Sequence, residues 1–307
     1  MPDQLRRAAL KNENYFDYYL VNISRYPPHW FWLGAAVLWL LAALLRWWVA
    51  PAFELLPTDY VAETSYAGKL WSRQTVLSAA EESESVVRRR DQTLTSRDGC
   101  SIIQGDAHWL TPAGVVIFET LNLYGVDRYN RQNLAGYGNE DRYGQYLFPP
   151  HLEKKQYSLW DSDYAGPRVV TFDHVEKLRG IEVYVFNSLA DGIDETAGFE
   201  SLPDVPEKYH ALSYGRGRFW IEPTSGVVVD YEDEGTSYFV GTKTGERIAE
   251  PMARWSAHYT GETITAQLRL ATKMCERMRA LELWLPVTFA AAGLIWIAAG
   301  LYTLRKD

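Results

Sequence analysis

The sequence predicts a membrane-anchored α+β protein, in which a mainly antiparallel β domain outside the cytoplasm is flanked by two transmembrane helices. Three observations predict this class: an apolar run near each end, basic residues beyond both runs, and a middle region rich in β-branched and aromatic residues. The 307 residues are enough for one sizeable domain with accessory segments. With 47% hydrophobic and 23% charged residues, the composition is neither disordered nor uniformly hydrophobic.

A polar, tyrosine-rich segment covers residues 1–28. Its paired aromatic residues suit an interfacial helix that lies on the cytoplasmic surface of a membrane. We therefore assign this segment to the cytoplasm. Pro27 and Pro28 separate it from the apolar run that follows.

The first apolar run predicts a transmembrane helix over residues 29–50. A helix needs about 20 residues to cross the hydrocarbon layer. The sixteen apolar residues from Trp30 to Leu45 fall short, but tryptophans at both ends extend the run into the headgroup zone. Arg46 can snorkel outward, and Pro51 is expected to end the helix. The long polar stretch before the run and the sequence WWVAPAF at its end favour an uncleaved anchor over a signal peptide.

The second apolar run predicts a transmembrane helix over residues 283–304, because its 22 residues carry no charge. Apolar residues at helical spacing over 263–282 predict a stalk helix that leads directly into it. Residues 305–307 form a short charged tail. Tryptophans near the ends of the two runs are predicted to be interfacial anchors: Trp30, Trp32, Trp47, Trp48 and Trp284.

Small residues on both predicted helices suit close helix–helix packing. The candidates are Gly34 and Ala42 on the first helix and Gly293 and Gly300 on the second. The alternative, that these residues are simple apolar filler, fits the sequence equally well.

Flanking charge predicts the orientation, because short basic flanks stay in the cytoplasm. Both termini are therefore expected in the cytoplasm, with the helices in the inner (cytoplasmic) membrane and residues 51–282 on its periplasmic side. The basic residues that predict this lie before the first run and after the second: Arg6, Arg7, Lys11, Arg25, Arg305 and Lys306.

Residues 51–262 form the predicted β-rich extracytoplasmic domain. The clearest signal is a hairpin of strands 218–222 and 227–231 around a turn that contains Pro223 and Gly226. Strands at short spacing without alternating helices favour an antiparallel β-sandwich or barrel. Other predicted strands cover residues 115–121, 168–172, 181–186, 236–240 and 257–260.

Several short motifs resemble a family of bacterial envelope proteins labelled porin PorA-like. The motifs are FELLP at 53–57, QYSLWD at 156–161, GIEVY at 180–184 and WIEPTSG at 220–226. The resemblance covers residues 53–230 and implies a similar layout, with an outer domain between two membrane spans. A β-type pore needs many strands of about 9–11 residues with alternating faces. Because the predicted strands are short and two helices provide the anchoring, we do not expect this domain to be a pore.

Motifs that carry chemistry are scarce. HExxH, GxSxG and Walker motifs are absent, so we expect a protein that is not an enzyme. No two of the six histidines have the spacing of a local metal pair, and no metal site is predicted. Acidic groups at 161–163 and 191–195 suit solvated turns better than calcium loops. Residues 232–234 are expected at a charged hairpin end, and the glycines of 214–218 in a turn before a strand.

His29 is the candidate cofactor-binding residue. A neutral imidazole beside Trp30 at a membrane interface can ligate a tetrapyrrole metal, and bacterial antenna polypeptides are similar in outline. His29 precedes the apolar run rather than lying within it, so the role of an interfacial anchor is favoured. No cofactor is predicted, although contact with pigment or lipid stays open. One disulfide between Cys100 and Cys275 also stays open.

The favoured function is a non-catalytic structural subunit of a bacterial integral membrane complex. A photosynthetic reaction-centre or antenna assembly is one candidate host. Other integral membrane subunits and lipid are the expected partners, and the net charge of −8 argues against nucleic acid. The alternative is an envelope ligand-binding or sensor protein, which the short cytoplasmic parts disfavour because they carry no output domain.

Overall fold

The computed structural model describes residues 27–73, 79–139, 141–161, 166–196 and 205–305. The chain divides into two compact units. One unit combines Met1–Phe53 with Arg277–Asp307, and the other is Glu54–Glu276. The two units are described separately below.

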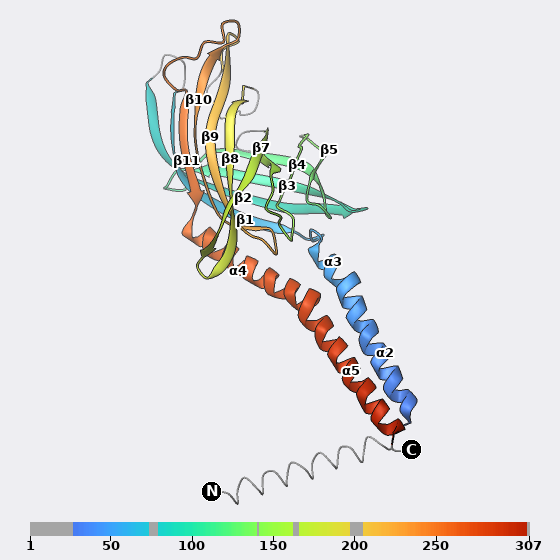
Figure 1. The fold of residues 1–307 in the computed structure, drawn as a ribbon. Coiled ribbons are helices and arrows are strands. Elements are labelled where there is room, and N and C mark those ends of the chain that lie inside the picture. The colour runs from blue at the N-terminus through green and yellow to red at the C-terminus, as the bar shows by residue number, and fades with distance from the viewer. Residues whose placement is uncertain (1–26, 74–78, 140, 162–165, 197–204, 306–307) are drawn as a thin grey trace, which may run out of the picture. The chain divides into compact units, whose positions relative to one another are not determined.

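The first unit is built from helices. The N-terminal helix consists of α2 (Pro28–Leu44), a π-helical turn (Leu45–Val49) and α3 (Ala50–Glu54). The C-terminal helix begins in the second unit with α4 (Gly261–Arg279). Its part in the first unit runs from Arg277 through a second π-helical turn (Ala280–Trp284) to α5 (Leu285–Leu304), which packs along α2 (Figure 1). Both helices are long and apolar enough to cross a membrane, and little of either apolar stretch is buried within the protein.

The expectation that Pro51 ends the first helix is wrong, because the helix continues to Glu54. Proline cannot donate the helical hydrogen bond, and its ring clashes with the carbonyl one turn earlier. The π-helical turn before Pro51 relieves this conflict, since the Ala50 N–H bonds the carbonyl of Leu45, five residues back. The same device precedes Pro286, where the Leu285 N–H bonds the carbonyl of Ala280.

The second unit contains one antiparallel sheet of eleven strands in the order β5-β4-β3-β2-β1-β11-β10-β9-β8-β7-β6 (Figure 1). Strands β1 to β5 pair with their neighbours in the sequence, and so do β6 to β11. The two groups are joined where β1 pairs with β11, and we call this pair of strands the seam. The strands are β1 (Val61–Arg73), β2 (Ala80–Arg97), β3 (Cys100–Leu110), β4 (Val116–Asp127), β5 (Asn133–Gly138), β6 (Tyr157–Asp161), β7 (Gly166–Leu178), β8 (Ile181–Asp194), β9 (Tyr209–Glu222), β10 (Val227–Gly241) and β11 (Ala253–Tyr259).

A single residue nearly closes this sheet into a barrel. The edge strands are β5 and β6, and Gln145 bridges the two edges. The backbone N–H of Gln145 donates to the Ser158 carbonyl at 2.6 Å, and its carbonyl accepts from the Trp160 N–H at 2.9 Å. On the other side Gln145 bridges Gln132, just before β5. The two expected architectures were a sandwich and a barrel, and the single curled sheet corresponds to the barrel-like one.

Aromatic side chains fill the inside of the sheet. One buried cluster gathers around Phe148, Phe186 and Phe219, and a second around Ile103 and Tyr124. On the opposite face of the sheet, apolar residues of α4 cover one end. Their contacts form a separate buried cluster of Leu268 and Ala271 with Val183, Val229 and Trp220.

The hairpin over 218–222 and 227–231 is confirmed, with Glu222 paired to Val227 across the turn. The expectation that the strands are short is wrong, because β9 covers 14 residues and β10 covers 15. Three expectations of turns are wrong. Residues 214–218 lie inside β9 and 232–234 inside β10, and the segment 191–194 continues β8 through a bulge. Glu195, expected in a solvated turn, is buried. Asp161 ends β6, and the two residues after it lie outside the described residues.

Candidate functional site

The predicted small residues on the two helices lie against aromatic side chains. A β-carbon at Gly34 would collide with the indole of Trp296, and one at Gly293 with the indole of Trp39. The Trp39 Nε1–H donates to the Ala290 carbonyl at 3.2 Å. The contacts are reciprocal, since each helix supplies a glycine to the other helix's tryptophan. In the same pair of helices Gly300 lies against Phe31, and Ala42 is half-buried.

Enlarging one of these glycines is expected to disrupt the helix pair. Gly293→Ile places a branched side chain where Trp39 packs, and overpacking of this kind costs about 1–3 kcal/mol. Leu294→Ile is the matched control, because Leu294 is 60% exposed. Thermal unfolding of the purified chain in detergent should show a lower midpoint for Gly293→Ile alone. Equal midpoints for the two variants would contradict the packing role.

The predicted interfacial tryptophans are all exposed, from 40% for Trp32 to 77% for Trp48. Trp30 and Trp32 lie within the first five residues of α2. At the other end of the pair the two π-helical turns contact each other, and they carry Trp47, Trp48 and Trp284. The five tryptophans predicted as interfacial anchors therefore lie at the two ends of the helix pair, whereas Trp39 and Trp296 lie in its middle. His29 is also exposed, with its ring 5.9 Å from that of Trp30.

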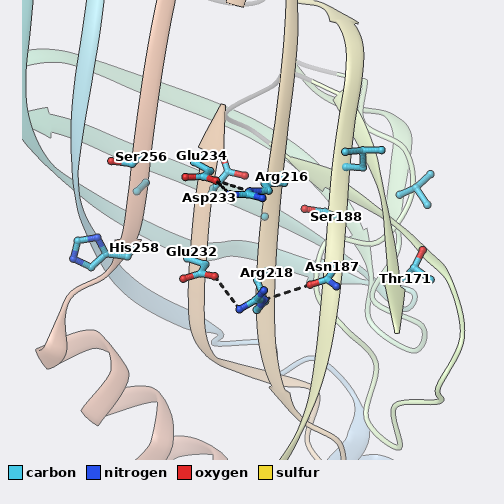
Figure 2. A pocket seen from close by; sticks show the side chains of 14 residues that line it. Thr171, Asn187, Ser188, Arg216, Arg218, Glu232, Asp233, Glu234, Ser256 and His258 are labelled. Atoms are coloured by element: carbon cyan, nitrogen blue, oxygen red, sulfur yellow. Dashed lines mark hydrogen bonds and ion pairs between the residues drawn. The ribbon is translucent and has the colours of Figure 1, made fainter. Parts of the chain in front are cut away.

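An open groove of about 980 Å³ lies on the outer face of β7 to β11 (Figure 2). Cross-strand pairing places its polar side chains in two rows. One row runs from Asn187 through Arg218 and Glu232 to His258, and the other from Leu189 through Arg216 and Glu234 to Ser256. The rows form the outward face because successive side chains of a strand alternate between the two faces.

Opposite charges pair within these rows. The Arg216 Nε–H donates to Glu234 Oε1 at 2.5 Å, and Arg218 Nη1 lies 3.4 Å from Glu232 Oε1. Arg218 also donates to Asn187 Oδ1 at 3.4 Å. Two arginines and two glutamates cancel in formal charge, so the groove offers hydrogen-bond donors and acceptors without a net charge. The arrangement can bind a polar group through these donors and acceptors.

A buried ion pair lies on the inner face of the same strands, and its Asp233 is among the residues that line the groove (Figure 2). Arg168 Nη1 and Nη2 each donate to Asp233 Oδ1 at 3.0 Å, and Nη2 also donates to Ser188 Oγ at 2.8 Å. The second carboxylate oxygen of Asp233 accepts from Trp255 Nε1 at 2.9 Å. Gly217, paired with Asp233, leaves the room that this cluster occupies.

The other half of the sheet repeats this arrangement. Asp91 is paired with Gly105 and accepts from the Tyr124 hydroxyl at 2.8 Å and from Arg89 Nε at 3.0 Å. A β-carbon at Gly105 would lie 2.8 Å from the Asp91 carboxylate. Burial, with a further contribution from Asp91, raises the pKa of Tyr124 above its ordinary range. In both halves an interior glycine makes room for a buried aspartate, which points to a structural role.

His174, an exposed residue of β7 between two carboxylates, is expected to have a pKa above the ordinary value of histidine. The Asp173 carboxylate lies 3.0 Å from His174 Nδ1 and the Glu176 carboxylate 3.2 Å from Nε2, and both carboxylates accept when the imidazole is protonated. These carboxylates raise the pKa of His174 above 6.5. Its contribution to stability is therefore fully present below pH 6.5 and is lost as the pH rises through the folded value. Titration of the imidazole by NMR should show this shift, and Asp173→Asn should reduce it. An unshifted His174 would contradict the contacts.

The two cysteines are not bridged. Cys100 lies in β3 and Cys275 in α4, and both are half-buried. The sequence left a bridge between them open. Sequence reasoning also missed the buried Arg168–Asp233 pair, because 65 residues separate the two positions and neither lies in a motif.

A nearly closed antiparallel sheet together with two exposed apolar helices indicates a membrane-associated protein of the cell envelope. The chain matches the family described as Porin PorA over residues 140–302, which is more than half of its length, and it belongs to that family. The predicted resemblance is thereby confirmed, but over a different region from the expected 53–230. The match begins at residue 140, so it leaves out the motif at 53–57, and it extends into α5. No curated protein matches the chain.

Proposed function

We propose that this chain is a non-catalytic accessory subunit of an inner-membrane complex. Two membrane-spanning helices would anchor it, and the β domain would lie in the periplasm. The observation that carries the proposal is a contrast between two surfaces: the helix pair exposes large apolar residues, whereas the outer face of the sheet exposes charged ones.

The exposed face of the helix pair supports membrane insertion. Soluble monomers rarely expose continuous apolar patches of this kind. Hydrocarbon is a suitable surrounding because every backbone group of a helix is bonded within the helix. Residues that are at least 49% exposed here include Leu33, Val37, Leu40, Leu294, Ile295 and Leu301.

The sheet itself is suited to water rather than lipid. Its outer face carries ion pairs such as Lys69 with Glu82 and Arg90 with Glu63, whereas a barrel in a membrane needs an apolar outer band. Its inside is packed with aromatic side chains, including Phe148, Phe186 and Phe219, rather than lined with polar ones. The porin name of the family therefore does not imply a pore through this sheet.

The remaining helix surface is suited to other integral membrane subunits and to lipid. Both groups would pack on the exposed apolar residues that the helix pair leaves uncovered. A reaction-centre or antenna assembly is one host that this proposal allows. Purification in mild detergent tests for a complex, and an absorption spectrum of the same material tests for a pigment-containing host.

Cysteine accessibility tests the orientation. In a background with Cys100→Ser and Cys275→Ser, Arg97→Cys reports on the β domain because the Arg97 side chain is 90% exposed. Asp307→Cys is the matched reporter at the opposite side. A membrane-impermeant maleimide should label the first variant in intact spheroplasts and the second only after permeabilisation. Labelling of Asp307→Cys in intact spheroplasts, or release of the chain by alkaline washing, would overturn the proposal.

A second function, envelope ligand binding, is favoured by the groove alone. Its volume of about 980 Å³ and its neutral rows of donors and acceptors suit an uncharged polar ligand. Thermal-shift measurements of the full chain in detergent, with a panel of neutral oligosaccharides, test this function. Arg218→Ala should abolish any shift, and a shift that survives this substitution would place binding elsewhere.

A further inference from the structure

We propose that Arg46 binds the phosphate of an anionic phospholipid in the outer leaflet of the inner membrane. Its π-helical turn also carries Trp47 and Trp48, and it contacts the turn that carries Trp284. The inference rests on the proposed function, since it requires that the helix pair spans the membrane. It adds a specific ligand chemistry to one end of that pair.

The position of Arg46 is unusual for a charged side chain. It is the only Lys, Arg, Asp or Glu between residues 27 and 53. It lies in the first π-helical turn, which contacts the second π-helical turn of the partner helix, and it is exposed. π-Helical turns inside α-helices occur frequently at functional sites.

The charge of Arg46 needs an anion that the described part of the chain does not supply. Among the described residues, no carboxylate forms an ion pair with Arg46. A guanidinium within a membrane is costly, and it extends toward the headgroups to find a partner. A phosphate diester is the anion present there, and guanidinium–phosphate pairs form two parallel, charge-assisted hydrogen bonds.

The spacing along the helix places Arg46 inside the hydrocarbon layer, within reach of the outer headgroups only if its side chain extends outward. At 1.5 Å per residue, Trp32 and Arg46 are about 21 Å apart along the axis, and Trp32 and Trp48 are about 24 Å apart. Both distances are shorter than the hydrocarbon thickness of about 30 Å. If Trp32 lies at the cytoplasmic edge of the hydrocarbon layer, the backbone of Arg46 lies about 9 Å inside its outer edge. Its side chain must extend outward, or a lipid phosphate must move inward.

Three exposed indoles complete the site. Trp47 is 70% exposed, Trp48 is 77% exposed and Trp284, on the second helix, is 64% exposed. Indole rings favour the boundary between acyl chains and headgroups, where one edge is apolar and the other is wet. A lipid would bury acyl and glycerol atoms on these rings while its phosphate meets Arg46. Free phosphate would contact Arg46 but would leave the three indole rings without an apolar contact. A lipid contacts both, and it is therefore the better occupant.

Lipid retention by the purified full chain tests the proposal. The chain is extracted in mild detergent and supplied with dioleoyl phosphatidylglycerol or dioleoyl phosphatidylcholine, and bound lipid is counted by native mass spectrometry. The unmodified chain should retain phosphatidylglycerol preferentially. Arg46→Gln should lower that retention by about tenfold, which is the loss of one charge-assisted contact, whereas Arg46→Lys should keep part of it.

Controls separate this site from general charge effects and from misfolding. Arg305→Gln removes a basic residue near the opposite end of the pair and should leave retention unchanged. Circular dichroism and the elution volume of Arg46→Gln show whether the chain is folded, and the Arg46→Lys result decides the matter if it is not. Equal retention by Arg46→Gln, or competition by millimolar inorganic phosphate, would overturn the inference. Release of the unmodified chain by alkali would instead overturn the proposed function.

Discussion

Replacing Asp233 with leucine is expected to destabilise the β domain by about 3–5 kcal/mol, because this is the cost of removing one partner from a buried ion pair. The Arg168 and Asp233 side chains are 1% and 3% exposed. The substitution leaves the guanidinium inside the sheet without that carboxylate, and it also removes the acceptor of the Trp255 indole N–H. Pulse proteolysis of the full chain in detergent, at increasing urea, measures the loss for the β domain.

A neighbouring residue on the same strand provides the control. Glu234 points to the opposite face and pairs with Arg216, whose side chain is 79% exposed. Exposed pairs contribute about 0–1 kcal/mol, so Glu234→Leu should have little effect. Replacing both members of the buried pair, with Arg168→Met and Asp233→Leu, should recover much of the lost stability because no unpaired charge then stays buried. Equal losses for Asp233→Leu and Glu234→Leu would contradict a dominant role for the buried pair.

The parts of the fold that sequence reasoning found are those with local signals. Two apolar runs identify the helices, since hydrophobicity over about 20 residues is enough to mark a potential span. The hairpin around Pro223 and Gly226 was found because its turn residues lie between two runs of β-branched and aromatic residues. The helical spacing over 263–282 likewise predicted α4.

The parts that sequence reasoning missed depend on contacts between distant residues. β2 contains the sequence SESVVRRRDQ. A strand with one buried face is recognised by alternating apolar and polar residues, and this pattern is missing here because the inward-facing residues include Arg89 and Asp91. The glycines on either side of Arg216 suggested a turn. In the structure Gly217 lies within a strand, where the absence of a side chain leaves room for the buried side chains of Ser188 and Asp233. Closure through Gln145 has no local pattern, since it joins edges that only the folded sheet brings together.

The candidate site shows the same division. The tryptophans at the helix ends were predictable because their residue type and position both indicate an interface. The groove was not predictable, since its rows combine four strands and depend on register. Register is set by the turns and by the buried face of each strand. A sequence in which Glu232–Asp233–Glu234 reads as one acidic run gives no sign that its middle residue points inward.

Replacing Gly68 with valine is expected to have the other large effect, at the seam between β1 and β11. Gly68 is paired with Ala257, and a β-carbon at Gly68 would overlap the backbone carbonyl of Ser256. A flexible side chain can move aside, but a backbone carbonyl within a sheet cannot move without breaking the pairing. We therefore expect a loss of about 3 kcal/mol, the upper end of the usual cost of overpacking.

Gly261→Ala is the control, because a β-carbon there meets no atom within 4 Å. Urea unfolding of the β domain should separate Gly68→Val clearly from this control. Because this seam joins the two halves of the sheet, wild-type stability in Gly68→Val would mean that the seam can separate without unfolding either half.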